Sequence, residues 1–89
     1  MPLNFRHGTS LGRKLEERGI SLDEVLRVLE VGEEANAHSN RKAKVAVFPF
    51  NAYRKNRWFE EKEVRVVYRK DPDGWLFVFT AIARYGRFS

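Results

Sequence analysis

Three arginines in the last third of the 89-residue chain are the side chains best suited to chemistry. Arg65 and Arg69 interrupt an otherwise apolar stretch, and Arg84 closes the next apolar stretch beside Tyr85. Guanidinium groups form bidentate hydrogen bonds with phosphate and stabilise the extra negative charge of a phosphorane-like transition state. We therefore expect the three arginines to gather at one anion-binding site. The alternative is that each pairs with a glutamate or extends along the sheet to solvent.

Proton transfer beside those arginines needs a titratable side chain, and the chain offers His7, His38 and Tyr85. Imidazole titrates near neutral pH, so either histidine is suited to act as general base in RNA cleavage by the 2′-hydroxyl. A phenol has an ordinary pKa near 10 and needs neighbouring cations for that role. We place Tyr85 and His7 with Arg65 and Arg84 as the predicted catalytic residues. The alternatives are a ring that only packs and histidines that are solvated at the surface.

The composition excludes several other chemistries. The chain has no cysteine, which excludes disulfides, thiolate catalysis and cysteine-based zinc sites. With two histidines and no clustered carboxylates, we expect no metal and no cofactor. No run approaches the roughly 20 apolar residues of a membrane span, and the N-terminus lacks the apolar core of a signal peptide. We expect a soluble cytoplasmic protein without a membrane partner.

The basic residues concentrate in the later part of the chain. Residues 35–89 hold twelve bases and five acids, a balance of +7 within a net charge of +5. Such asymmetry favours an anionic partner such as a nucleic acid, and rings among cations can stack on unpaired bases. The residues that we predict to contact nucleic acid are Arg54, Lys55, Arg57, Trp58 and Arg69. The alternatives are cations that only keep strands soluble and rings that cover the edge of the core.

Two helices are predicted in the first third of the chain. The first runs from about residue 9 or 10 to residue 18, because Gly19 is the usual residue just past a helix end. The second runs over about residues 22–31, because Ser21 and Glu24 form a capping box before a broad apolar stripe.

Extended segments fill the rest of the chain. Residues 43–50 are predicted to form a strand, and two strong strands follow at about 63–70 and 75–84. Residues 35–40 are a short strand or a loop. Residues 51–62 are either a long exposed connection or an extension of a hairpin.

The chain is short enough for one domain only. We expect a helical part at about residues 9–32 and a sheet part at about residues 35–85 within a single domain, residues 1–89. Helices followed by strands predict an α+β fold. In that fold, two N-terminal helices pack on a three- to four-stranded antiparallel sheet.

The last two strands are predicted to form a hairpin around the turn Asp71-Pro-Asp-Gly74. This turn suits a three-residue loop, which gives the pairs 69–77, 67–79 and 65–81. The face that packs on the helices then carries Val64, Val66, Tyr68, Leu76, Val78, Thr80 and Ile82. The other face carries Arg65, Val67, Arg69, Phe77, Phe79, Ala81 and Tyr85. A four-residue loop would shift the pairing by one residue and exchange partners between the faces.

Two patches resemble a known family. The segment Val64-Arg-Val-Val-Tyr-Arg69, followed by a turn and an apolar strand ending in Thr80-Ala-Ile-Ala-Arg84, resembles the C-terminal hairpin of the RelE/ParE toxin superfamily. The stretch Glu17-Arg-Gly-Ile-Ser-Leu-Asp-Glu-Val25 resembles small uncharacterised RelE-like domains that carry an Arg-Gly-Ile-Ser signature. The resemblance implies a toxin-like ribonuclease fold.

The resemblance also implies roles for particular residues. Members of the RelE branch cleave RNA without metal, using basic residues on the sheet and at its C-terminal end. By this match Arg65 is similar to the strand arginine and Arg84 to the arginine after the last strand. Arg18 is similar to the signature arginine, which adds it to the predicted nucleic-acid contacts. The related domains carry a histidine at the position of Ser10, and this chain has His7 one turn earlier.

The resulting functional prediction is a toxin-like, metal-independent endoribonuclease that acts on RNA phosphodiesters. Its expected partners are RNA and an acidic antitoxin protein that wraps the basic face of the sheet. Two alternatives stay open. One is a nucleic-acid-binding domain without catalysis, and the other is an inhibitor of a protein target, as in the ParE branch, which shares the scaffold but is not a nuclease.

Overall fold

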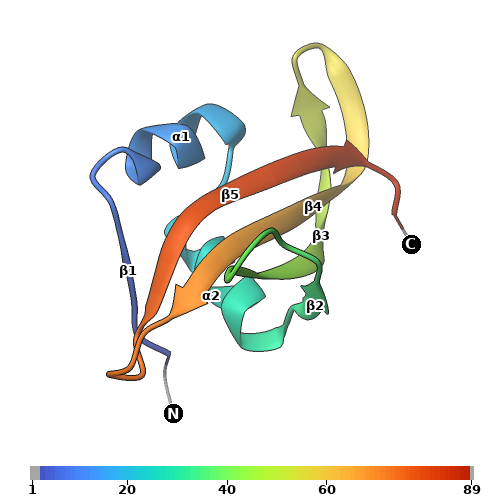
Figure 1. Ribbon diagram of the computed structural model, residues 1–89. Coiled ribbons are helices and arrows are strands. Elements are labelled where there is room, and N and C mark those ends of the chain that lie inside the picture. Colours follow the sequence, from blue (N-terminus) through green and yellow to red (C-terminus); the bar gives the residue numbers. More distant parts are fainter. Residues whose placement is uncertain (1–2, 89) are drawn as a thin grey trace.

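The computed structural model describes residues 3–88, in which two helices lie between a short first strand and the main strands (Figure 1). The elements are β1 (Phe5–His7), α1 (Leu11–Arg18), α2 (Leu22–Val31), β2 (Glu33–Ala35), β3 (Lys42–Arg54), β4 (Arg57–Lys70) and β5 (Leu76–Gly86). Within these described residues, neither helix has the length and apolar character needed to cross a lipid bilayer.

The five strands form one mixed sheet in the order β1-β5-β4-β3-β2. β1 lies at the edge and runs parallel to β5, with Phe5 opposite Leu76, whereas all other neighbours are antiparallel. The prediction of a three- to four-stranded antiparallel sheet is therefore wrong. The strands β1 and β2 have three residues each, which is too short for the alternation that identifies a strand in a sequence.

Local sequence signals set the ends of both helices. The Ser21 hydroxyl accepts a hydrogen bond from the Glu24 N–H at 3.1 Å, and the Glu24 carboxylate accepts one from the Ser21 N–H at 3.0 Å. The predicted bounds of α2, residues 22–31, are confirmed. Past α1, Gly19 has a φ of 70°, and a Cβ there would lie 2.6 Å from the Tyr85 hydroxyl oxygen. Both the left-handed backbone and the lack of space therefore require glycine at this position.

The helices pack on one face of the sheet and enclose the core there. The buried side chains of this core are Leu11, Leu15, Ile20, Val25, Val28, Leu29, Val64, Val66, Tyr68, Leu76, Val78 and Ala81. Alternate residues of each strand point to this side, because successive side chains of a strand point to opposite faces. We call the two sides of the sheet the helix face and the helix-free face.

Residues 51–62 form an extension of the β3–β4 hairpin and not a long connection. The strands meet at a two-residue turn, Lys55-Asn56, where φ is 51° and 68°. Positive φ at both central residues is typical of a type I′ turn, whose twist fits an antiparallel strand pair. The tip of this hairpin projects beyond the rest of the sheet (Figure 1) and carries Arg54 opposite Arg57.

The β4–β5 hairpin has the predicted turn. The Asp71 N–H donates to the Trp75 carbonyl at 2.8 Å, which closes a three-residue loop. Arg69 lies opposite Phe77, so the predicted pair 69–77 is confirmed.

A β-bulge at Phe79 then shifts the register by one residue. Tyr68 lies opposite Val78 and Val67 lies opposite Thr80, so Phe79 is the extra residue on β5. The predicted pair 67–79 is therefore wrong. A bulge of this kind leaves one residue unpaired and bends the strand.

The bulge exchanges the two faces of β5 beyond Phe79. Arg65 lies opposite Ile82, so the predicted pair 65–81 is also wrong. Thr80 and Ile82, predicted to face the helices, lie on the helix-free face. Ala81 and Tyr85, predicted on the face of Arg65, lie on the helix face instead.

Candidate active site

The three arginines predicted to form one cluster share the helix-free face but do not meet in one pocket. Arg84 is paired with Glu63 at 2.7 Å, and Arg69 is paired with Asp71 at 2.7 Å. The two arginine side chains are 67% and 49% exposed. Arg84 and Arg69 therefore each have a carboxylate partner at the surface, where an ion pair contributes at most about 1 kcal/mol to the free energy of unfolding. Arg65 differs from them in that it lines a cavity.

A cavity of about 660 Å³ lies between the helix-free face of β4 and β5 and the loop of residues 36–41, which crosses the sheet in Figure 1. We call it the sheet cavity. Its lining residues are Asn36, Ala37, His38, Arg41, Arg65, Val67, Thr80 and Ile82. No carboxylate is among them, so the cavity favours an anionic ligand. Its volume is in the range of small-ligand sites, roughly 300–1,000 Å³.

A tight turn holds His38 and Arg41 at the rim of the sheet cavity. The Arg41 N–H donates to the His38 carbonyl at 3.2 Å, and Ser39 between them has a φ of 59°. The Cα atoms at the ends of such a turn lie within about 7 Å of each other, so the imidazole and the guanidinium share one rim. The Arg41 Cζ lies 3.9 Å from the centre of the Phe79 ring, and this cation–π contact positions the guanidinium group.

Arg65 supplies a second guanidinium group from the middle of β4. Its neighbours Val64 and Val66 are fully buried on the helix face, so the Arg65 side chain points to the opposite face. Its Nη2 donates to the Asn36 carbonyl, which ties the loop to the sheet. A guanidinium group has several N–H donors, so Arg65 keeps donors for an anion in the cavity.

The floor of the sheet cavity is largely apolar and depends on the bulge at Phe79. In the unbulged register Thr80 and Ile82 would face the helices, whereas here both line the cavity and Ile82 is 44% exposed. The Thr80 Oγ1 accepts a hydrogen bond from Arg18 at 3.1 Å and keeps its own proton to donate. The cavity thus combines cationic walls with a floor that suits a sugar or a base.

Sequence reasoning considered His38 as a general base but placed His7 in the site, and it counted Arg41 only among the basic residues. The signal that joins His38 to Arg41 is the pair Ser39-Asn40 between them, because serine and asparagine are typical turn residues. A turn at these two residues brings the imidazole to the arginine three positions later.

The other predicted catalytic residues, His7 and Tyr85, lie away from the sheet cavity. His7 is exposed on β1 at the edge of the sheet, opposite Val78. Val78 and Tyr85 are separated by seven positions on β5, which corresponds to roughly 23 Å along a strand. The Tyr85 hydroxyl donates to the Arg18 carbonyl at 2.7 Å on the helix face. The structure therefore brings neither His7 nor Tyr85 to Arg65.

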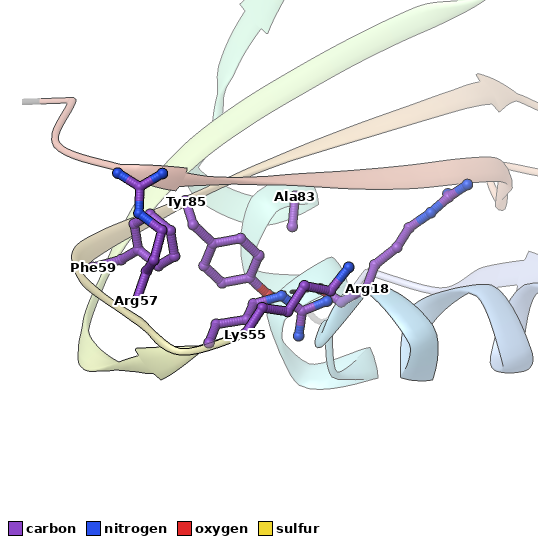
Figure 2. Close-up of a pocket in the computed structure, with 7 residues that line it drawn as sticks. Arg18, Lys55, Arg57, Phe59, Ala83 and Tyr85 are labelled. Atoms are coloured by element: carbon purple, nitrogen blue, oxygen red, sulfur yellow. Dashed lines mark hydrogen bonds between the residues drawn. The ribbon is translucent and has the colours of Figure 1, made fainter.

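Most of the residues predicted to contact nucleic acid gather at a second cavity. Its lining residues are Arg18, Arg54, Lys55, Arg57, Phe59, Ala83 and Tyr85 (Figure 2). We call it the helix-face cavity, because Tyr85 and the end of α1 lie on that side of the sheet. Trp58 points to the other side of the hairpin tip, where its ring packs edge-on against Tyr53 with centroids 5.4 Å apart. Arg69 stays on the helix-free face, 4.9 Å from the centre of the Phe77 ring.

Comparison of this chain with protein-family models, with curated proteins and with solved structures finds no match. The resemblance to the RelE/ParE superfamily therefore stays a prediction that depends on the quoted motifs.

Tyr85 gives the protein an expected sensitivity to alkali. Burial raises the pKa of Tyr85 above its ordinary value, and this effect outweighs the lowering by the Arg54 guanidinium. The unfolded chain therefore releases the proton at lower pH than the folded protein does. The stabilisation is complete below about pH 10 and is lost as the pH rises through the folded-state pKa. As the pH rises above about 10, Tyr85→Phe should lose less free energy of unfolding than wild type.

Urea unfolding at a series of pH values measures this difference. Tyr53→Phe is the matched control, because the Tyr53 side chain is 72% exposed and its variant should follow the wild-type curve. Equal losses in Tyr85→Phe and wild type would contradict the prediction.

Proposed function

We propose that this protein is a toxin-like, metal-independent endoribonuclease that cleaves RNA in the sheet cavity. The observation that carries the proposal is one cavity lined by the His38 imidazole and by the guanidinium groups of Arg41 and Arg65, with no carboxylate in the lining. General base catalysis and stabilisation of phosphorane charge are two of the requirements of phosphodiester cleavage without a metal. The resemblance of the β4–β5 hairpin to the RelE branch supports the same activity.

The proposed reaction uses a hydroxyl of the substrate as the nucleophile. His38 takes the proton of the ribose 2′-hydroxyl, and the 2′-oxygen forms a bond to the adjacent phosphorus. Arg41 and Arg65 bind the non-bridging oxygens and stabilise the negative charge that builds up on them. The bond from phosphorus to the 5′-oxygen breaks, and the leaving oxygen takes a proton from water. The products are a 2′,3′-cyclic phosphate and a 5′-hydroxyl end.

The shape of the sheet cavity favours unpaired RNA. The loop of residues 36–41 covers part of the cavity, so a nucleotide has to leave a base stack before its sugar and phosphate can enter. Val67 and Ile82 on the floor can then pack against the sugar or base, and Thr80 can donate a hydrogen bond. We therefore propose single-stranded segments as the substrate class.

We also propose an acidic protein partner, because the lining of the sheet cavity is cationic. An acidic antitoxin would neutralise the cations of the helix-free face and close the sheet cavity by covering Arg41 and Arg65. Such a partner would inhibit the enzyme without any change in its fold.

The test is RNA cleavage by the purified protein in the presence of EDTA. Wild type should produce 2′,3′-cyclic phosphate ends and should leave a DNA strand of the same sequence intact, because DNA lacks the nucleophile. Arg65→Ala and Arg41→Ala should each lower the cleavage rate about 10²- to 10³-fold, the usual effect of removing a donor to a transition-state oxyanion.

Arg69→Ala is the matched control for these two variants. It removes an arginine from the same face, but one that is paired with Asp71 outside the cavity, so its cleavage rate should stay close to that of wild type. Intact RNA after incubation with wild type, or equal rates for Arg65→Ala and Arg69→Ala, would refute the proposal.

A further inference from the structure

We infer that the helix-face cavity is a second nucleic-acid site, which binds the phosphate backbone of a single strand independently of the sheet cavity. The inference rests on the proposed function only in naming RNA as the natural strand. The binding chemistry itself is that of a phosphodiester with an adjacent unpaired base.

The cations of this cavity come from segments far apart in the sequence. Arg54, Lys55 and Arg57 lie at the tip of the β3–β4 hairpin, and Arg18 ends α1. Figure 2 shows the Tyr85 ring between Arg57 and Phe59 on one side and Arg18 on the other, with Lys55 extended across the opening. The cavity has a volume of about 370 Å³.

The charges of the hairpin tip are not compensated within residues 3–88. Arg54 and Arg57 lie directly opposite each other on the two strands, with Lys55 in the turn between them. Like charges in this arrangement repel each other and destabilise the hairpin. No ion pair with a carboxylate involves these three residues or Arg18 in the described part of the chain. An anion between them would remove this repulsion.

Part of the site is preorganised. The Arg54 Nη2 donates to the Glu17 carbonyl at 2.9 Å, and its Cζ lies 4.7 Å from the centre of the Tyr85 ring. The Tyr85 hydroxyl is in turn fixed on the Arg18 carbonyl. A site that is already ordered loses less conformational entropy when its ligand binds.

Two rings in the lining point to a nucleic acid and not to a simple anion. The rings of Phe59 and Tyr85 have centroids 5.8 Å apart, and the Arg57 Cζ lies 5.6 Å from the Phe59 ring centre. Rings beside cations bind single strands, because bases stack on the rings while the cations follow the backbone. An acidic peptide would use the cations but would offer no base to stack on the rings.

The experiment uses a fluorescently labelled single-stranded oligodeoxynucleotide, which cannot be cleaved through a 2′-hydroxyl. Its affinity for the full chain is measured by fluorescence anisotropy at several salt concentrations. The double variant Lys55→Ala/Arg57→Ala should bind about 10- to 100-fold more weakly than wild type. Its plot of log affinity against log salt should be shallower by about 1.4, because two phosphate contacts are lost.

The matched control is the double variant Arg13→Ala/Lys14→Ala. It removes the same net charge from exposed positions of α1 that line no described cavity. This variant should bind within about two-fold of wild type. Lys55→Gln alone, with an unchanged urea midpoint, should show about a 3- to 10-fold loss, which separates binding from folding.

Two outcomes would overturn the inference. One is equal affinity of Lys55→Ala/Arg57→Ala and its control, and the other is binding of polyglutamate with the affinity and salt dependence of the oligonucleotide. Cleavage of RNA by wild type with no loss of binding in the Lys55 and Arg57 variants would refute this site and leave the proposed function standing. Binding that depends on Lys55 and Arg57 without cleavage would support this site and refute the nuclease.

Discussion

Replacement of His38 by alanine is expected to slow RNA cleavage by about 10²- to 10⁴-fold, the usual contribution of a general base. Among the lining residues of the sheet cavity, His38 is the one imidazole, the side-chain type most often used as a general base. The side chain is exposed in a turn, so the free energy of unfolding should change by less than about 0.5 kcal/mol. The rate is measured with a short single-stranded RNA in EDTA, and stability by urea unfolding.

His7→Ala provides the matched control. It removes the other histidine, which is also exposed but lies on β1 at the edge of the sheet, and it should cleave RNA at the wild-type rate. Free imidazole in the buffer should restore part of the activity of His38→Ala, because the deleted ring leaves room for it beside the bound substrate. A His38→Ala rate equal to that of His7→Ala, or an absence of rescue, would contradict the assigned role.

The elements that could be predicted from the sequence are those with local signals. The capping box of Ser21 and Glu24 sets the start of α2, and Gly19 sets the end of α1 through a backbone conformation that other residues rarely adopt. The turn at Asp71–Gly74 can likewise be predicted from its own four residues, which are typical of a tight hairpin turn. Each of these signals depends on at most four neighbouring positions, so no knowledge of the sheet is needed to read them.

The bulge at Phe79 could not be predicted in this way. Phe79 is neither glycine nor a turn residue, and the run of apolar and aromatic residues around it is typical of a regular strand. The bulge is decided by packing, since it places Ala81 in the core beneath the helices while Thr80 and Ile82 face the opposite side. An error of one residue in the register was enough to place Tyr85 on the wrong face.

The candidate site was only partly predictable for the same reason. Arg65 lies on β4, whereas the extra residue of the bulge is on β5. The alternation of side chains along β4 therefore predicted the face of Arg65 correctly. His38 and Arg41 lie close together because of a turn in a segment with no clear periodicity. The position of this turn over β4 depends in addition on where β2 joins the sheet. The cluster at the hairpin tip depends on the extension of β3 and β4 to residues 54 and 57.

Lys62→Ala is expected to have the largest effect on stability, about 2 to 4 kcal/mol, because it breaks a largely buried ion pair. The Lys62 side chain is 7% exposed, and its Nζ lies 2.7 Å from the Glu24 carboxylate and 2.8 Å from the Gly19 carbonyl. The substitution leaves both acceptors without their donor. It also weakens the link between β4 and the start of α2, where the same carboxylate completes the capping box.

The free energy of unfolding of a small domain is only about 5 to 15 kcal/mol, so a loss of this size should shift the urea midpoint strongly. Lys44→Ala is the matched control. Lys44 also donates to a backbone carbonyl, that of Leu29 at 2.9 Å, but forms no ion pair with a carboxylate of residues 3–88, so its loss should cost about 1 kcal/mol. In the double variant Lys62→Met/Glu24→Gln, the unpaired buried charge is absent, and stability should exceed that of Lys62→Ala by at least about 1 kcal/mol. If Lys62→Ala and Lys44→Ala lose equal amounts, the ion pair does not hold α2 on the sheet, and burial of Val25 and Leu29 against Val64 and Val66 alone accounts for the position of the helix.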